Sequence, residues 1–220
     1  METPRIAILI PAFNEERTVG AVITGSLRFG DVFVSDDGST DSTSDSSRAH
    51  GATVISQGAN YGYSSALSFG LAFLLEQGYQ LIVTLDADGQ HDPCDIAHFV
   101  NGLMSDSDIV VGRRLKRARL MEKIFGLLTA SLSNVSDPLC GMKGFRAELL
   151  QDKGELETYE SVGTELLVYA IAKHYRVTTV PIIERSRADS PRFAKTLEAN
   201  VLISLALAKG FRKFLAFRFG

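Results

Sequence analysis

Two carboxylates separated by one residue offer the clearest chemistry in this chain of 220 residues. Asp86 and Asp88 follow an apolar run that is typical of a buried strand. In extended backbone, side chains two positions apart point to the same side, so both carboxylates could bind one hard cation such as Mg²⁺ or Mn²⁺. Gln90 could add a neutral oxygen to that ion. The alternative is a solvated turn before a helix, because Asp92-Pro93 is typical of a helix N-cap followed by proline.

Polar side chains also follow two earlier apolar runs. Asn14 and Glu15 come after the first run, and Asp36 and Asp37 come after the second. A carboxylate at a strand end can accept hydrogen bonds from a base N–H or a ribose hydroxyl. On its own, the second segment is more typical of a plain strand-to-helix turn. The chain contains neither a Gly-x-Gly-x-x-Gly fingerprint nor a Walker A sequence, which excludes phosphate loops of those two kinds.

Basic residues gather directly after residue 112. Residues 113–123 contain six Lys or Arg side chains, with Glu122 as the one acid among them. A solvated basic face is the usual structure for such a run. A positive cluster at the carboxyl end of a strand could also bind an anionic acceptor, and both interpretations stay open.

These side chains need a scaffold, and the hydrophobic pattern predicts one. Short β-branched runs alternate with helical stretches, which indicates an α/β fold with a mostly parallel sheet covered by helices. We expect strands at residues 5–10, 31–35, 53–56, 81–85, 108–111 and 176–180. We expect helices at 18–27, 42–50, 64–76 and 95–104, a helical segment ending near 134, and a final helix over about 193–219. Ligands of such sheets bind beyond the carboxyl ends of the strands, where the carboxylates would lie.

Length and composition fit one globular domain, with 45% apolar residues and a net charge of −3. We divide it into a nucleotide-sugar-binding half (1–112), an acceptor half (113–192) and a C-terminal amphipathic helix (193–220). The net charge argues against a general nucleic-acid binder, and two cysteines indicate a reducing compartment, so we expect a cytoplasmic protein. No signal peptide is expected, because residues 5–11 are typical of a buried strand, and the apolar run 201–208 is too short to cross a bilayer.

Five segments, taken in their order, resemble the family 2 glycosyltransferases, and within them the dolichyl-phosphate (polyprenyl-phosphate) mannosyltransferase and glucosyltransferase branch. They are residues 8–16 (ILIPAFNEE), 34–41 (VSDDGSTD), 60–63 (NYGY), 85–93 (LDADGQHDP) and 111–114 (VGRR). The resemblance covers about residues 4–192 and implies the GT-A fold. It also implies inverting transfer of a hexose from a nucleotide-sugar of the GDP-mannose or UDP-glucose type.

The resemblance further implies a role for individual residues on the donor side. Asp86, Asp88 and Gln90 would hold Mg²⁺ or Mn²⁺ on the donor diphosphate. Residues expected to bind the nucleotide are Pro11, Ala12, Asn14, Glu15, Asp36, Asp37, Asp86 and Ala87, although Asp36 could instead orient its loop. Residues expected to take part in catalysis are Asp88, Asp137 and Arg119.

On the acceptor side, two segments are similar to the family with departures. Residues 137–146 resemble its Asp-Pro…Gly-Phe-Arg segment, and 187–192 resemble Arg-x-x-Gly-x-Ser-Lys with Asp189 and Arg192 at the changed positions. A polyprenyl-phosphate acceptor would need cations to position it rather than a base. The candidates are Arg113, Arg119, Lys143, Arg146, Arg187 and Arg192. The alternative, a saccharide or small-molecule hydroxyl, would need a carboxylate base, for which Asp137 is the leading candidate.

Basic and aromatic residues interleave in the last twelve positions, among them Lys213, Phe217 and Arg218. A helix of this kind suits the surface of an anionic membrane, which would place the protein at the cytoplasmic membrane face. A terminal helix packed on the core, with its polar groups reaching solvent, is the alternative. Glu165 matches the family's Glu-Leu-Leu helix and could equally be a helix-start carboxylate.

Overall fold

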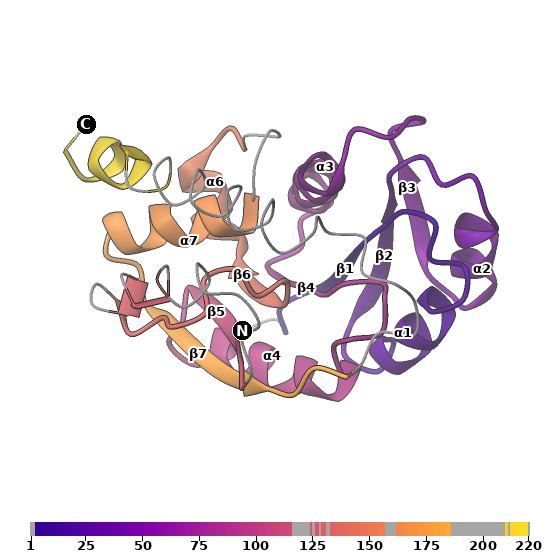
Figure 1. Ribbon diagram of the computed structural model, residues 1–220, viewed down its shortest axis with the longest axis horizontal. Coiled ribbons are helices and arrows are strands. Elements are labelled where there is room, and N and C mark those ends of the chain that lie inside the picture. The colour runs from indigo at the N-terminus through magenta and orange to yellow at the C-terminus, as the bar shows by residue number, and fades with distance from the viewer. Residues whose placement is uncertain are drawn as a thin grey trace.

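The computed structural model describes residues 3–115, 124, 126–127, 129–130, 133–156, 162–185, 210 and 212–219. These residues form a seven-stranded sheet in the order β3-β2-β1-β4-β6-β5-β7 (Figure 1). Strand β6 runs antiparallel to both neighbours, and the remaining pairings are parallel. The strands are β1 (Ile6–Ala12), β2 (Asp31–Asp36), β3 (Thr53–Ser56), β4 (Leu81–Thr84), β5 (Ile109–Arg114), β6 (Lys143–Arg146) and β7 (Val177–Ile182).

Helices cover both faces of the sheet. They are α1 (Val19–Ser26), α2 (Thr43–Ala49), α3 (Tyr63–Glu76), the 3₁₀ turn η1 (Pro93–Asp95), α4 (Ile96–Met104), α6 (Ala147–Lys153) and α7 (Val162–Ala172). The six expected strands and four expected internal helices are confirmed, with ends that move by no more than three residues. The described residues between 124 and 133 and between 210 and 219 are helical, and the rest of those two expected helical segments lies outside the described residues.

Alternate residues of each central strand pack into two separate cores. Ile8 and Ile10 of β1 face α1 and α4, whereas Ala7 and Leu9 face the side of α3, α6 and α7. This is the period of two expected of a strand that is buried on both faces. The fold therefore has three layers, with helix, sheet and helix stacked in turn.

The order in which the chain adds strands to the sheet reverses at β1. The chain adds β2 and β3 on one side of β1 and then returns to add β4 on the other. In open α/β sheets, such a reversal marks the place beyond the carboxyl ends of the strands where a ligand-binding crevice is expected. Because β6 is antiparallel, its first residue Lys143 pairs with Thr84, and residues 137–142 arrive at that same edge.

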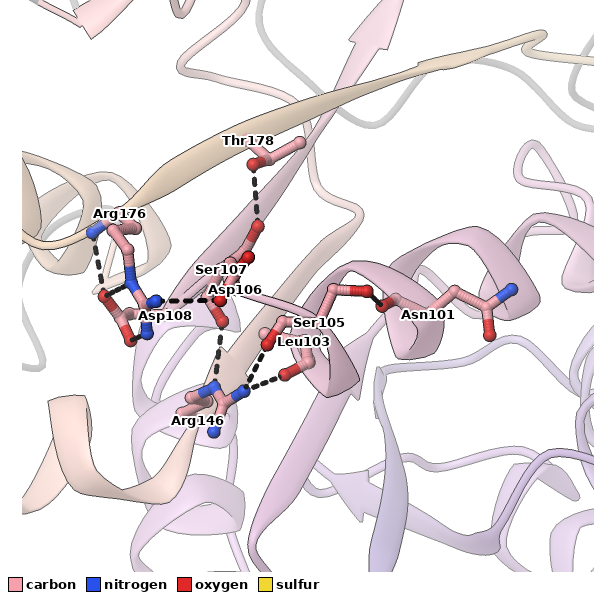
Figure 2. Close-up of polar contacts among 9 residues, drawn as sticks. All are labelled: Asn101, Leu103, Ser105, Asp106, Ser107, Asp108, Arg146, Arg176 and Thr178. Atoms are coloured by element: carbon pink, nitrogen blue, oxygen red, sulfur yellow. Dashed lines mark hydrogen bonds and ion pairs between the residues drawn. The ribbon is translucent and has the colours of Figure 1, made fainter.

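Arg146, the last residue of β6, lies at the opposite end of the strands, where it pairs with Leu81 at the start of β4. Its guanidinium donates to the carbonyls of Leu103 and Ser105 at the end of α4, and Nε donates to the carbonyl of Ser107 at 2.9 Å (Figure 2). The last carbonyls of a helix have no partner within the helix, so Arg146 satisfies groups that would otherwise be left without one.

Arg176 links the start of β7 to the turn after α4 at this end of the sheet. Its backbone N–H donates to Asp108 Oδ2 at 2.8 Å, and its guanidinium contacts Asp106 and Asp108 at 3.2 Å (Figure 2). Ser107 Oγ donates to Thr178 Oγ1 at 2.6 Å. These contacts join the turn after α4 to β6 and β7 at the end of the sheet farthest from the crevice.

Arg146→Met should lower the free energy of unfolding by about 1–3 kcal/mol, because it leaves part-buried helix carbonyls without a donor. Urea unfolding followed by circular dichroism measures this loss. Arg176→Met is the matched control, since its exposed ion pairs should contribute less. Equal stability of wild type and Arg146→Met would contradict a structural role for Arg146.

Candidate functional site

The loops that follow β1 and β2 are tied to each other. Asn14 donates from its backbone N–H to Ser39 Oγ at 2.9 Å and accepts from the backbone N–H of Thr40 at 2.8 Å. Glu15 donates its backbone N–H to Thr43 Oγ1 at 2.8 Å. Asn14 adopts a φ of 53°, a left-handed conformation that asparagine tolerates better than most residues. The two loops are therefore held together at the carboxyl ends of β1 and β2.

Asp36 and Asp37 are buried at the end of β2, and their carboxylates accept hydrogen bonds from the loops around them. Asp36 accepts from the backbone N–H of Ser39 at 3.1 Å and from Ser44 Oγ at 2.6 Å. Asp37 accepts from the backbone N–H groups of Tyr61 and Gly62 at 2.8 and 2.9 Å. For Asp36 this agrees with the alternative that it orients its loop. Nucleoside contacts by Asp37, Pro11, Ala12, Asn14 and Glu15 stay predictions.

Asp86 lies two residues beyond β4, between a helix start and a loop from the acceptor half. Tyr63 Oη donates to Asp86 Oδ1 at 3.1 Å, and the Asp86 backbone N–H donates to Nδ1 of the buried His91 at 3.4 Å. A Cβ added to Gly141 would overlap Asp86 Oδ2, so glycine is needed for this approach. The Asp86 side chain is still 32% exposed, which leaves room for a ligand.

The expectation that Asp86 and Asp88 share one extended strand is wrong. The backbone turns at Ala87 and Asp88, and Gly89 takes a φ of 75°. Asp88 Oδ1 then accepts the backbone N–H of Gln90 at 3.0 Å. Because β4 ends at Thr84, a turn rather than the alternation of a strand places the second carboxylate.

The predicted metal ligands have the donor chemistry of a site that also includes substrate oxygens. Asp86, Asp88 and Gln90 are all partly exposed. Among the described residues, no group of three or more His, Cys, Asp and Glu side chains could hold a metal alone. Mg²⁺ is commonly bound by one or two carboxylates together with substrate phosphates. Two carboxylates and an amide have the chemistry of such a partial set, and metal binding by Asp86, Asp88 and Gln90 stays a prediction.

The acceptor-half loop 137–142 is attached to the end of β4. Thr84 Oγ1 contacts the carbonyls of Gly141 and Lys143 at 3.1 and 3.3 Å. Lys143 is buried, its Nζ donates to the carbonyl of Cys140, and burial lowers the pKa of its ammonium. Binding of an acceptor phosphate by Lys143 stays a prediction.

Asp137 makes a buried ion pair with Arg114. The aspartate is 1% exposed, and its oxygens accept from Arg114 Nε at 2.7 Å, Nη2 at 2.8 Å and the backbone N–H at 3.0 Å. Burial alone would raise the pKa of Asp137, but the hydrogen bonds and charge of Arg114 outweigh burial and hold the pKa below its usual value. A carboxylate held in this way is a poor proton acceptor. The structure thus corrects the prediction of Asp137 as a general base.

Glu184, just after β7, lies on the other side of the same arginine. Arg114 Nη1 is 3.7 Å from Glu184 Oε1, and burial raises the pKa of Glu184. The next residue, Arg185, donates its backbone N–H to the Gln90 carbonyl at 2.8 Å and its guanidinium to Asp92. The end of β7 therefore contacts the loop that carries the predicted metal ligands.

The other predicted acceptor cations are not brought together in the part of the chain that the structure describes. Arg113 is exposed at the end of β5. Arg119, Arg187 and Arg192 lie outside the described residues. Arg146 lies at the opposite edge of the sheet, where it caps α4, so its prediction as a phosphate ligand is corrected.

Four residues at this edge were missed by sequence reasoning as parts of the site. Tyr63, His91 and Gly141 surround Asp86, and Arg114 pairs with Asp137. All four lie in segments already similar to the family, so each had a signal. No local pattern indicates that Tyr63 reaches Asp86, because that contact exists only once α3 packs beside β4.

The described part of the C-terminal helix packs on α7. Phe217 meets Tyr169 edge-on with ring centroids 5.2 Å apart, and Lys213 Nζ lies 3.4 Å from the buried Glu165 carboxylate. Lys153 approaches the same carboxylate at 3.2 Å. This agrees with the alternative of a packed terminal helix. In the described residues, no helix combines the length and apolar character needed to cross a membrane.

Comparison with known proteins gives concordant results. Residues 7–151 match the family described as Glycosyl transferase family 2. An uncharacterized protein from Methanocaldococcus jannaschii is 32% identical over 195 residues, covering 80% of each chain. A dolichyl-phosphate hexose transferase from Haloferax volcanii is 31% identical over 202 residues, covering 85% of this chain and 86% of the relative.

Solved structures show the same architecture. Glucosyl-3-phosphoglycerate synthase from Mycobacterium tuberculosis, in complex with Mn²⁺, UDP and glucosyl-3-phosphoglycerate, superposes with a TM-score of 0.76. The identity is 22%, and the match covers 97% of this chain and 80% of the other. The predicted GT-A fold is confirmed.

Gly141→Ala should weaken binding of Mn²⁺ together with a nucleoside diphosphate by about tenfold or more, because the added methyl displaces the Asp86 carboxylate. Calorimetric titration with UDP and with GDP, each in the presence of Mn²⁺, measures the change. The melting temperature separates this local effect from unfolding. Unchanged binding in a folded variant would show that the position of Asp86 does not matter to the metal.

Asp137→Asn should lower the free energy of unfolding at pH 7 by about 3–5 kcal/mol, because the buried Arg114 loses its charged partner. Pairing depresses the folded pKa below the unfolded value of about 3.9. The stabilisation is therefore complete above that pH and is lost as pH falls through the folded pKa. Urea unfolding at several pH values should show the difference between wild type and variant shrinking in acid. An equal difference at all pH values would contradict this assignment.

Proposed function

The chain belongs to glycosyl transferase family 2, and we propose that it transfers a hexose from a nucleotide-sugar to a polyprenyl phosphate with inversion. The observation that carries the proposal is the arrangement at one sheet edge. Asp86 and Asp88 are partly exposed beyond the end of β4, and the acceptor loop that packs against Asp86 has its aspartate, Asp137, already neutralised by Arg114. The relative from Haloferax volcanii is named for transfer involving dolichyl phosphate, which supports this acceptor class.

The donor half would bind the nucleotide-sugar across the switch point beside β1. The loops after β1 and β2 would bind the nucleoside, and Asp86, Asp88 and Gln90 would hold Mg²⁺ or Mn²⁺ on the diphosphate. Such a cation offsets the negative charge that builds on the leaving nucleoside diphosphate. A phosphate oxygen of the acceptor would attack the anomeric carbon from the opposite face while the bond to the diphosphate breaks.

The acceptor class follows from the need for a base. A phosphate is ionised at neutral pH, so its attack releases no proton that a side chain must accept. The alternative, a saccharide or small-molecule hydroxyl, would need a carboxylate base near the site. Glu184 would suit that role better than Asp137, because burial raises its pKa toward the range in which a base works.

A polyprenyl-phosphate acceptor would bring the protein to a membrane surface, which we propose is the cytoplasmic face. The C-terminal helix supports this placement. It leaves Leu215 and Phe219 exposed, the latter at 80%, beside the exposed cations Arg212 and Arg218. Apolar and basic groups together on one helix suit an anionic bilayer surface.

Purified protein should transfer hexose from GDP-mannose or UDP-glucose to polyprenyl phosphate when Mg²⁺ or Mn²⁺ is present, and chelation should abolish transfer. Asp88→Asn should lower the rate about a hundredfold through loss of a metal ligand. Thin-layer separation of the labelled lipid product measures both. Polyprenol, which lacks the phosphate, is the matched control acceptor. Transfer to polyprenol or to a saccharide would favour the hydroxyl alternative, and failure to bind either nucleotide would refute the donor assignment.

A further inference from the structure

Tyr63, the first residue of α3, lies between two parts of the proposed site. These are the nucleoside-binding end of β2 and the metal-binding carboxylate of Asp86. The Tyr63 hydroxyl donates to Asp86 Oδ1 at 3.1 Å, and the residue is 46% exposed. Gly141 packs against the other carboxylate oxygen, Oδ2, so closely that a Cβ at this position would overlap it. The Asp86 carboxylate is therefore held between a helix start and the acceptor loop.

The position of Tyr63 is in turn set by Asp37. Both oxygens of Asp37 accept backbone N–H groups of the turn just before the helix, those of Tyr61 and Gly62. Gly62 has a φ of 93°, and its carbonyl accepts the backbone N–H groups of Ser65 at 3.0 Å and Ala66 at 3.1 Å. The turn and the helix start are thus anchored to the end of β2. Three consecutive residues, 61–63, span from the carboxylate of β2 to the carboxylate after β4.

We propose that Tyr63 is a positioning residue for Asp86, and that residues 61–63 make metal binding at Asp86 depend on the order of the nucleoside-binding end of β2. The inference rests on the proposed function. Groups that hydrogen-bond a metal-binding carboxylate fix its orientation and affect metal affinity without touching the ion. Tyr63 has the geometry for this role, since its hydroxyl reaches one oxygen of the carboxylate and the Asp86 side chain stays 32% exposed.

Tyr63→Phe tests the proposal because it removes one hydroxyl and keeps the ring. Calorimetric titration of UDP and GDP at increasing Mn²⁺ should show that the half-saturating Mn²⁺ concentration rises about tenfold. Nucleotide affinity without metal and the melting temperature should stay as in wild type. Tyr79→Phe is the matched control, since it removes a similar tyrosine–aspartate hydrogen bond, to Asp31 at 2.6 Å, at the opposite edge of the sheet.

Two results would overturn the proposal while wild type still binds nucleotide with Mn²⁺. One is the same Mn²⁺ dependence in Tyr63→Phe and wild type. The other is an equal loss of nucleotide affinity with and without Mn²⁺, which would mean that Tyr63 contacts the donor directly. If wild type itself shows no Mn²⁺-dependent binding of UDP or GDP, the proposed function fails first, and the role of Tyr63 fails with it.

Discussion

Strand β1 pairs in parallel with β2 on one side and with β4 on the other, and these two ladders of backbone hydrogen bonds decide where the chemistry lies. Parallel strands end at the same edge, so residues near 12, 36 and 86 meet although they are distant in sequence. The strand order reverses at β1, and ligands of open α/β sheets generally bind at such a point. The antiparallel β6 then adds the acceptor loop to the same edge, because it begins where its neighbours end.

Gathering carboxylates at one edge requires that most of them be neutralised by the protein. A buried charge without partners is strongly unfavourable. Asp37 is compensated by two backbone N–H groups and Asp137 by a guanidinium. Asp86 and Asp88 differ, since they are only partly buried. Burial therefore divides the carboxylates at this edge into those that organise loops and those that can still bind a cation.

The sequence predicted the parts of the fold that have a strong local signal. The parallel strands carry apolar runs with the period of a buried sheet, so their positions were confirmed. Strand β6 was missed because its four residues, Lys143 to Arg146, begin and end with charged side chains and contain a glycine. Its strand conformation depends on pairing with β4 and β5, which no local pattern reveals. The same omission explains why Arg146 was predicted at the wrong edge of the sheet.

The site shows a similar division between local and tertiary information. The turn at Gly89 and the carboxylates of Asp86 and Asp88 are visible in the sequence, whereas the roles of Asp37 and Asp137 depend on partners that lie 24 and 23 residues away. The sequence alone does not show the hydrogen-bond partners of either aspartate. In the folded glycosyltransferase they accept hydrogen bonds that hold the nucleotide-side turn and the acceptor loop in place. This end of the sheet therefore carries carboxylates of two kinds, and the buried ones order the turn and the loop that lie on either side of Asp86.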